Sequence, residues 1–390
     1  MKTEKLWKIK LFSFFFLLVS NSYAWDFRGY VKAFAESFSS PQDNSFIGGD
    51  YWAEFISTRF SFLGDFNQNF SAEASYQLVP FYGRTFIALY NVRNINLKSY
   101  RAYDLNLFLV DPDETKKNSF SIVQNLDRLF FTYSDEKFIA TLGRQIVTFG
   151  SAKIVNPTDV VTPFGLNTID TEERPGSDAA RLKYFISQFS LEGGFLAGHH
   201  FDSDLNAWFV RFNGNFQKHD AYLMLMDFRG NNQLLGFNWE GNISGATGWA
   251  EGSYVTGDKN YFRFSTGLQY FFVGQWTLFG EYHFNGIGAY NKNDYLKVLT
   301  SPSFIAANLF LVGKDYFSVF LNKEISPLLK GGIGSTANLH DWSTLVNLNF
   351  EWNFSTNNYL TFTYFNGFGP TGTEFSAYPA NLIFEYRLYY

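Results

Sequence analysis

Alternation of large apolar and small polar side chains is the dominant pattern along this chain. Leu360, Phe362 and Tyr364 share one parity, and Thr361 and Thr363 share the other. Because successive side chains of a strand point to opposite faces, this pattern predicts an extended segment with one apolar and one polar face. The same alternation recurs at 260–272, 275–287 and 342–354.

Segments of this kind, separated by turn signals, recur from the first part of the chain to its last residue. The predicted strands are 25–38, 52–64, 69–80, 124–134, 137–148, 179–187, 189–198, 205–215, 218–228, 232–241, 246–256, 260–272, 275–287, 314–325, 327–337, 342–354, 358–367 and 380–390. Their connections alternate between short and long, and an even strand count with this asymmetry is typical of outer-membrane barrels. The segment 81–123 can hold a further pair at 86–92 and 105–110, which would make 20 strands, and 16 is the other alternative to 18.

The last predicted strand carries an apolar stripe that a lipid-facing barrel strand accounts for. The stripe consists of Leu382, Phe384, Tyr386, Leu388 and Tyr390. Aromatic residues make up 21% of the chain, whereas a soluble sandwich would place Val and Ile inside with fewer flanking aromatics. The predicted fold is therefore all-β: a transmembrane antiparallel up-and-down β-barrel of about 18 strands, with a long loop folded inward.

The N-terminus has the pattern of a secretory signal peptide. A lysine-rich start precedes the apolar run 11–19. In Ser22-Tyr23-Ala24 the small residues Ser22 and Ala24 stand third from last and last before the expected cleavage site. The apolar run is too short to span a bilayer as a helix, although an uncleaved anchor is the alternative. We expect cleavage after Ala24, which divides the chain into a signal peptide, 1–24, and a barrel, 25–390.

Charge and cysteine usage narrow the classes of partner. The formal net charge is −5, and it is more negative without the lysine-rich start. A surface of this sign argues against nucleic acid, because phosphate binding requires a basic surface. The chain has no Cys, which excludes disulfides, thiolate metal sites and a lipid-modified N-terminal Cys. The expected location is the outer membrane, with its lipid as a partner.

Charged side chains on the inward parity are the candidates for lining a pore. The basic candidates are Arg28, Lys32, Arg59, Arg128, Arg144, Arg181, Lys183, Arg211 and Arg263. The acidic candidates on the long loop 149–178 are Asp159, Asp170, Glu172 and Glu173, and one inward strand adds Glu281 and His283. If the loop folds inward, a basic wall faces an acidic constriction, and fixed charges of this kind select among solutes. The alternative is that these groups only satisfy one another in a wet interior.

Catalytic and cofactor chemistry is not expected. Adjacent His199 and His200 lie in a connection and point to opposite faces if extended, which does not suit chelation. The run 340–343 contains His, Asp and Ser, but sequence neighbours do not form a hydrogen-bonded relay. The chain has no nucleophile elbow, Walker loop or dinucleotide fingerprint, so the prediction is no enzyme and no cofactor. Residues 156–159 are expected to cap a short helix.

Two features of the sequence, one run of residues and the final aromatic residue, resemble known outer-membrane proteins. The first is Leu142-Gly143-Arg144-Gln145, followed by Phe149-Gly150, Asn156-Pro157-Thr158-Asp159-Val160, Pro163-Phe164, Glu173-Arg174-Pro175-Gly176 and Asp178-Ala179-Ala180-Arg181-Leu182. It resembles a run in loosely annotated porin-like outer-membrane proteins, and it covers about a tenth of the chain. The resemblance implies a barrel with an inserted loop and names no solute. The final Tyr390 resembles the terminal aromatic signature of outer-membrane barrels, which implies recognition by the barrel-assembly machinery.

The expected function is a porin: a water-filled channel for passive diffusion of small hydrophilic solutes or ions, constricted by 149–178 against the basic wall. The alternative is a substrate-specific or non-channel barrel, such as an adhesin, an envelope-assembly protein or a transporter of hydrophobic compounds. A barrel hydrolase ranks last. A monomer and a homotrimer are both compatible with the sequence, because a lipid-facing stripe and a subunit interface have similar composition.

Overall fold

A computed structural model describes residues 24–39, 50–83, 103–105, 120–166, 168 and 170–390. The predicted signal peptide lies outside the described residues, apart from Ala24 itself. The same holds for the extra strand pair considered within 81–123, apart from Leu105.

The described residues form eighteen strands in one sheet, and each of the eighteen predicted segments corresponds to one of them. The strands are β1 (Ala24–Ser39), β2 (Asp50–Asp65), β3 (Phe70–Gly83), β4 (Phe120–Ser134), β5 (Phe138–Gln145), β6 (Ser177–Ile186), β7 (Phe189–Leu196), β8 (Ala207–Phe216), β9 (His219–Phe228), β10 (Asn232–Ile243), β11 (Ala246–Thr256), β12 (Tyr261–Phe272), β13 (Trp276–Asn285), β14 (Asp315–Ser326), β15 (Leu329–Asn338), β16 (Thr344–Ser355), β17 (Asn358–Phe368) and β18 (Ala380–Tyr389). All neighbouring strands pair antiparallel in sequence order, as the up-and-down prediction requires.

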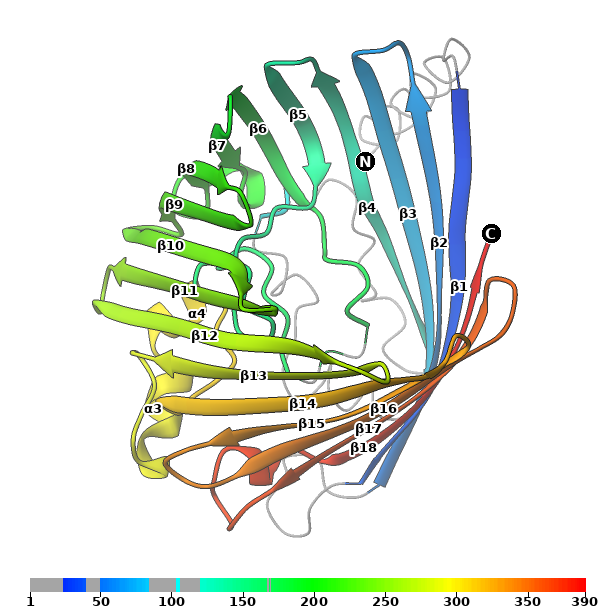
Figure 1. The fold of residues 1–390 in the computed structure, drawn as a ribbon, viewed down its shortest axis with the longest axis vertical. Coiled ribbons are helices and arrows are strands. Elements are labelled where there is room, and N and C mark those ends of the chain that lie inside the picture. Colours follow the sequence, from blue (N-terminus) through cyan, green and yellow to red (C-terminus); the bar gives the residue numbers. More distant parts are fainter. Residues whose placement is uncertain (1–23, 40–49, 84–102, 106–119, 167, 169) are drawn as a thin grey trace.

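Pairing of the first strand with the last closes the sheet into a barrel (Figure 1). The register of β1 and β18 runs from Tyr30 opposite Tyr389 to Ser39 opposite Ala380. Beyond this ladder, Gly29 and Tyr390 exchange two backbone hydrogen bonds of 2.9 and 3.0 Å. A Cβ at Gly29 would lie 2.7 Å from the Tyr390 hydroxyl. Glycine at this position therefore makes room for the ring that finishes the seam.

The two faces of the sheet separate as the alternation predicts. Large apolar side chains are exposed on the outside, for example Leu142 at 65% and Phe384 at 54%. Polar side chains of the opposite parity are buried inside the ring, such as Ser265 at 0% and Arg263 at 3%. An apolar exterior around a polar interior is the arrangement of a barrel that lies in lipid.

Several of the described connections at one rim are long. They contain the short helices η2 (His199–Phe201), η3 (Lys292–Asp294), α3 (Tyr295–Leu299), α4 (Pro302–Ala306) and η4 (Phe375–Ala377). The segment that follows β5 lies within the ring of strands in Figure 1, and we call residues 146–176 the inward loop. No helix in the described part of the chain is long and apolar enough to cross a membrane.

The inward loop begins earlier than the alternation predicts. The segment 137–148 was expected to be a single strand, but β5 ends at Gln145. Val147 and Phe149 are apolar residues at alternate positions, and they are 1% and 2% exposed because they pack inside the barrel. Alternation alone does not distinguish a lipid-facing side chain from one that faces an apolar surface within the lumen.

Candidate functional site: the lumen and its inward loop

The base of the inward loop packs on an apolar surface that the wall presents inside the barrel. The aromatic rings of Phe149 and Phe209 meet edge to face, with centroids 4.9 Å apart. Val160 and Val161 are fully buried in the same cluster. The residues of this cluster on β7–β13 are Leu196, Ala207, Phe209, Met224, Met226, Phe228, Leu234, Val255 and Tyr261. We call the strands β7–β13, which carry this surface and the two anchors described next, the packed wall.

Two carboxylates of the packed wall hold the backbone of the loop. Glu251 on β11 accepts hydrogen bonds from the backbone N–H groups of Ser151 (3.0 Å), Ala152 (3.1 Å) and Thr158 (2.8 Å). Its side chain is fully buried, at 0% exposure. A loop without regular structure leaves its N–H groups without strand partners, and a carboxylate can satisfy several of them at once.

Glu281 on β13 repeats this arrangement one step further along the loop. It accepts from the N–H groups of Lys153 (2.7 Å), Ile154 (3.2 Å) and Val155 (2.9 Å). The indole N–H of Trp249 donates to the same carboxylate at 3.0 Å. The inward loop is thus fixed to the packed wall at two successive points.

Residues 156–159 form a turn, so the predicted short helix is wrong. The carboxylate of Asp159 accepts from the N–H groups of Val161 (3.0 Å) and Thr162 (3.1 Å). Ser253 on the wall donates to the carbonyl oxygen of Pro157 at 2.7 Å. Backbone groups that a helix would pair internally are here bonded to side chains of the loop and the wall.

The far end of the loop meets the opposite side of the barrel through ion pairs. Lys32 on β1 contacts Asp170 at 2.8 Å and Glu172 at 2.7 Å. Tyr389 on β18 donates its hydroxyl hydrogen to Glu172 at 2.7 Å. Arg387 on the same strand lies 3.9 Å from Glu172 and also pairs with Glu351. We call β1–β6 and β18, which face this end of the loop, the charged wall.

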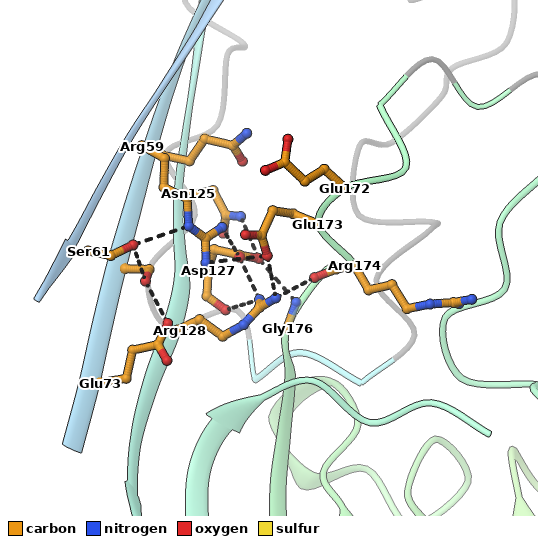
Figure 2. A network of polar contacts seen from close by, with 12 residues as sticks. Arg59, Ser61, Glu73, Asn125, Asp127, Arg128, Glu172, Glu173, Arg174 and Gly176 are labelled. Carbon is orange, nitrogen blue, oxygen red and sulfur yellow. Dashed lines mark hydrogen bonds and ion pairs between the residues drawn. The ribbon is translucent and has the colours of Figure 1, made fainter. Parts of the chain in front are cut away.

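A second charge cluster on the charged wall involves Arg59 and Arg128 (Figure 2). Both guanidinium groups contact Asp127, each at 2.5 Å. Both also face Glu173 of the loop, at 3.8 Å from Arg59 and 3.3 Å from Arg128. Arg128 further donates to the carbonyl oxygen of Arg174 at 2.7 Å. The acidic loop and the basic wall predicted from the sequence are therefore in contact.

Other predicted basic residues pair with acids of the barrel itself. Arg144 makes two hydrogen bonds to Asp178, at 2.9 and 2.7 Å, and also contacts Asp104. Arg181 and Arg211 share a wall carboxylate that has 1% exposure, Glu192, and Arg211 approaches it at 2.5 Å. Residues paired in this way satisfy the interior, as the second interpretation of the inward charges proposed.

The remaining candidates separate into those near open space and those beneath the loop. Arg28 is exposed, and Lys183 is half-buried, with its ammonium group 5.0 Å from the Phe185 ring centre. Arg263 is 3% exposed and donates to the carbonyl oxygen of Pro157, and His283 is hydrogen-bonded to a neighbouring serine. Asp159 is buried within the loop, and Glu281 and His283 are buried beneath it.

Burial and nearby charge act differently on the two adjacent loop acids. Burial raises the pKa of Glu173 above its ordinary value, against the lowering effect of Arg59 and Arg128. Burial also opposes ionisation of Glu172, but hydrogen bonds from Lys32 and Tyr389 outweigh it and lower the pKa of Glu172. Glu172 is thereby the more firmly ionised of the two.

A cavity of about 630 Å³ lies between the charged wall and the loop. Its lining combines side chains of β1–β6 and β18 with Glu172 and Glu173 of the loop. The charged lining residues are Arg28, Arg59, Glu73, Arg128, Glu172, Glu173 and Arg181. The cavity lies on the charged side of the barrel, and the packed wall contributes no lining residue to it.

A buried polar centre joins the long connections of the same rim. Glu374, between β17 and β18, accepts from Val312 N–H (2.9 Å), the Tyr316 hydroxyl (2.5 Å) and the Asn338 side-chain amide (2.8 Å). Asp341 accepts from the Glu374 N–H at 2.7 Å. Burial raises the pKa of Glu374 to about 7, despite these hydrogen bonds.

The histidines singled out in the sequence have ordinary polar partners. His340 is hydrogen-bonded to Asp315 at 2.6 Å, whereas Ser343 donates its hydroxyl hydrogen to Asp341 at 2.7 Å. His340 and Ser343 therefore have separate partners and do not form the Ser–His contact of a hydrolase triad. Among the described residues, no group of three or more potential metal ligands is present.

Sequence reasoning missed Asp127 and Glu251. A β-bulge shifts the register between β3 and β4 at Ser75 and Tyr76, so Asp127 and Arg128, which are neighbours, both point inward. Strict alternation places one of two neighbours outside, so it cannot find such a pair. Glu251 shares its parity with Ser253 but also with Trp249 and Val255, so the separation into apolar and polar faces that identified Glu281 is missing from this strand.

Comparisons with known proteins give similarity in structure. No protein-family model and no curated protein matches the sequence. The chain is similar to Acinetobacter baumannii OccAB3 (TM-score 0.59, 8% identity, covering 94% of this chain and 99% of that one) and OccAB2 (0.58, 9%, 95% and 99%). It is also similar to Pseudomonas aeruginosa OccD3 (0.55, 10%, 93% and 91%). These proteins share its fold.

Proposed function

We propose that this protein is an outer-membrane porin, through which small hydrophilic solutes or ions diffuse passively. The apolar exterior of the closed barrel supports a location in lipid. The fold shared with OccAB3 and OccD3 and the resemblance of the 142–182 region to porin-like proteins are consistent with it. The predicted signal peptide supplies the export route.

The observation that carries the proposal is the charged cavity of about 630 Å³ beside the inward loop. A packed interior would leave no such space next to so many ionised side chains, because charges buried without water or a partner are costly. Arg28 lies in the lining and is exposed. In this proposal the cavity belongs to the water-filled path, and residues 170–173 form its narrow section against the charged wall.

The test is single-channel conductance of the refolded 25–390 barrel in a planar bilayer, with the reversal potential measured under a salt gradient. We expect stable conductance steps. Replacing Asp170, Glu172 and Glu173 together with Ser keeps the loop length, and it should raise conductance and shift the reversal potential toward anion selectivity. A wild-type barrel that is folded and inserted but electrically silent would contradict the proposal.

A second candidate is a closed barrel that presents its loops to an external partner. The inward loop fills one side of the lumen, which favours this second candidate. Phe149, Val160 and Val161 are buried there, so that side cannot be part of an open path. Liposome swelling separates the two candidates. Swelling in small sugars no faster than in protein-free vesicles would support the closed barrel.

Assembly through the final strand is part of the proposal. The Tyr390 ring covers Gly29, and its hydroxyl donates to the carbonyl oxygen of Arg59 on β2 at 2.9 Å. Tyr390 thus connects the end of β18 with β1 and β2 at the seam. This position is consistent with recognition of the C-terminal strand by the barrel-assembly machinery. Export of a Tyr390→Ala variant to the outer-membrane fraction tests this, with Tyr386→Ala on the same strand face as the control.

A further inference from the structure

The ion-pair cluster on β2 and β4 has a member, Asp127, that points inward but lies buried beneath the cavity surface. Asp127 is the extra residue of the β4 bulge, because Ser75 pairs with Arg128 while Tyr76 pairs with Leu126. Its carboxylate is only 4% exposed. Bulges re-aim side chains and commonly lie beside functional sites.

Two arginines meet on a single oxygen of this carboxylate. Arg59 Nη1 and Arg128 Nη1 both contact Asp127 Oδ2 at 2.5 Å. Two adjacent guanidinium groups repel each other, and the shared anion offsets this repulsion and fixes their separation. Their remaining Nη2 atoms point toward Glu173 Oε2, at 3.8 and 3.3 Å. The four charges alternate in sign around a closed ring, as Figure 2 shows.

The two acids of the ring differ in exposure. Glu173 is 33% exposed and lines the cavity, whereas Asp127 is not a lining residue. The second oxygen of Asp127 accepts from the Gly176 N–H at 3.1 Å, where the loop rejoins the sheet. A Cβ at Gly176 would lie 2.1 Å from the carbonyl oxygen of Asp127, so only glycine permits this approach. Asp127 thus touches both arginines and the end of the loop.

We propose that Asp127 is a positioning residue that sets the ion selectivity of the channel from beneath its surface. It holds Arg59 and Arg128 together and cancels one of their two charges, so that Glu173 neutralises the remainder. The narrow section is then close to neutral at this point, although two arginines line it. This inference rests on the proposed channel function.

Removing the buried charge should therefore change permeation more than removing a charge from the lining itself. In Asp127→Asn the ring carries one net positive charge, and we expect the anion-to-cation permeability ratio to rise about threefold. The matched control is Glu73→Gln. Glu73 lines the same cavity and loses the same charge, but it reaches Arg59 only through the hydroxyls of Ser75 and Ser61.

A double variant separates positioning from a general loss of structure. Asp127→Asn combined with Arg128→Gln removes one charge of each sign, so the permeability ratio should return to near the wild-type value. Arg128→Gln alone should shift the ratio toward cations. If Asp127→Asn does not yield inserted barrels, the comparison of Arg128→Gln with the double variant decides the question by itself.

The outcomes are distinct. A larger shift for Asp127→Asn than for Glu73→Gln, with restoration in the double variant, supports the proposal. A shift no larger than that of Glu73→Gln, or a double variant that stays shifted, overturns it. Absence of conductance from the folded wild-type barrel contradicts the channel function instead, and the two failures are therefore distinguishable.

Discussion

The packed wall and the charged wall hold the same loop by different means. On the packed wall, Glu251 and Glu281 accept backbone N–H groups in fully enclosed positions, beside apolar contacts of Phe149. On the charged wall, residues 170–173 are held by ion pairs whose acidic partners are about a third exposed. Buried anchors are costly to break, whereas partly solvated ion pairs contribute little to stability. The base of the loop is therefore fixed, while the charges at its far end can vary with little cost to the fold.

The largest effect is expected from breaking an anchor of the packed wall. Glu281→Ala leaves three backbone N–H groups and the Trp249 indole without their acceptor. Each unsatisfied buried donor costs about 1–3 kcal/mol, so the docked state of the loop should be destabilised by about 3 kcal/mol or more. Limited proteolysis of the folded barrel should then cut within 146–176.

The matched control for this variant is Glu36→Ala. Glu36 is a buried carboxylate of β1 that accepts from Asn381 on the neighbouring strand and makes no hydrogen bond to the described residues of the loop. The loop should remain protected from protease in that variant. Equal cleavage in the two variants would show that the wall carboxylates do not anchor the loop.

A smaller, pH-dependent effect is expected at Glu374, which anchors the neighbouring connections of the same rim. The pKa of Glu374 is raised from 4.5 to about 7. Between these two pH values the carboxyl group is protonated in the folded protein and ionised in the unfolded chain. Stability should therefore fall as the pH rises from about 4.5 to about 7, and level off above that range. Asp341, Tyr316 and Tyr295 face the same centre and belong to the titrating environment.

The difference between wild type and Glu374→Gln isolates this contribution from the other carboxylates. Hydrogen exchange of the peptide 369–379, corrected for the intrinsic rate, should increase with pH in the wild type and stay flat in the variant. The same slope in both proteins would exclude Glu374 as its source.

The smallest effect on stability is expected from the charged wall. Lys32→Gln removes the partner of Asp170 and Glu172, both of which can become hydrated. We expect a loss of about 1 kcal/mol or less, together with a shift of reversal potential toward cations that weakens at high salt. A stability loss as large as that of Glu281→Ala would remove the distinction between the two walls.

Alternation together with the turn signals predicted the number of strands and their order. A strand repeats every two residues, so parity assigns Lys32, Arg59 and Arg263 to the interior without knowledge of the partners. The partners required the path of the inward loop, which no local pattern encodes. The bulge at Asp127 also breaks parity. The expectation that residues 156–159 cap a short helix ignored competition from wall side chains for the same backbone groups.

The pairing of β1 with β18 also has a kinetic consequence. Tyr30 and Tyr389 are opposite each other in the sheet although they lie near opposite ends of the chain, so their contact closes a very long loop. Contacts of this separation form slowly, and until they form two unpaired strand edges are open to association with other molecules. The slow step of refolding should therefore be closure of this seam. A side chain at Gly29, which would crowd the Arg59 carbonyl oxygen and Tyr390, should lower the yield of closed barrels before it alters any property of those that do close.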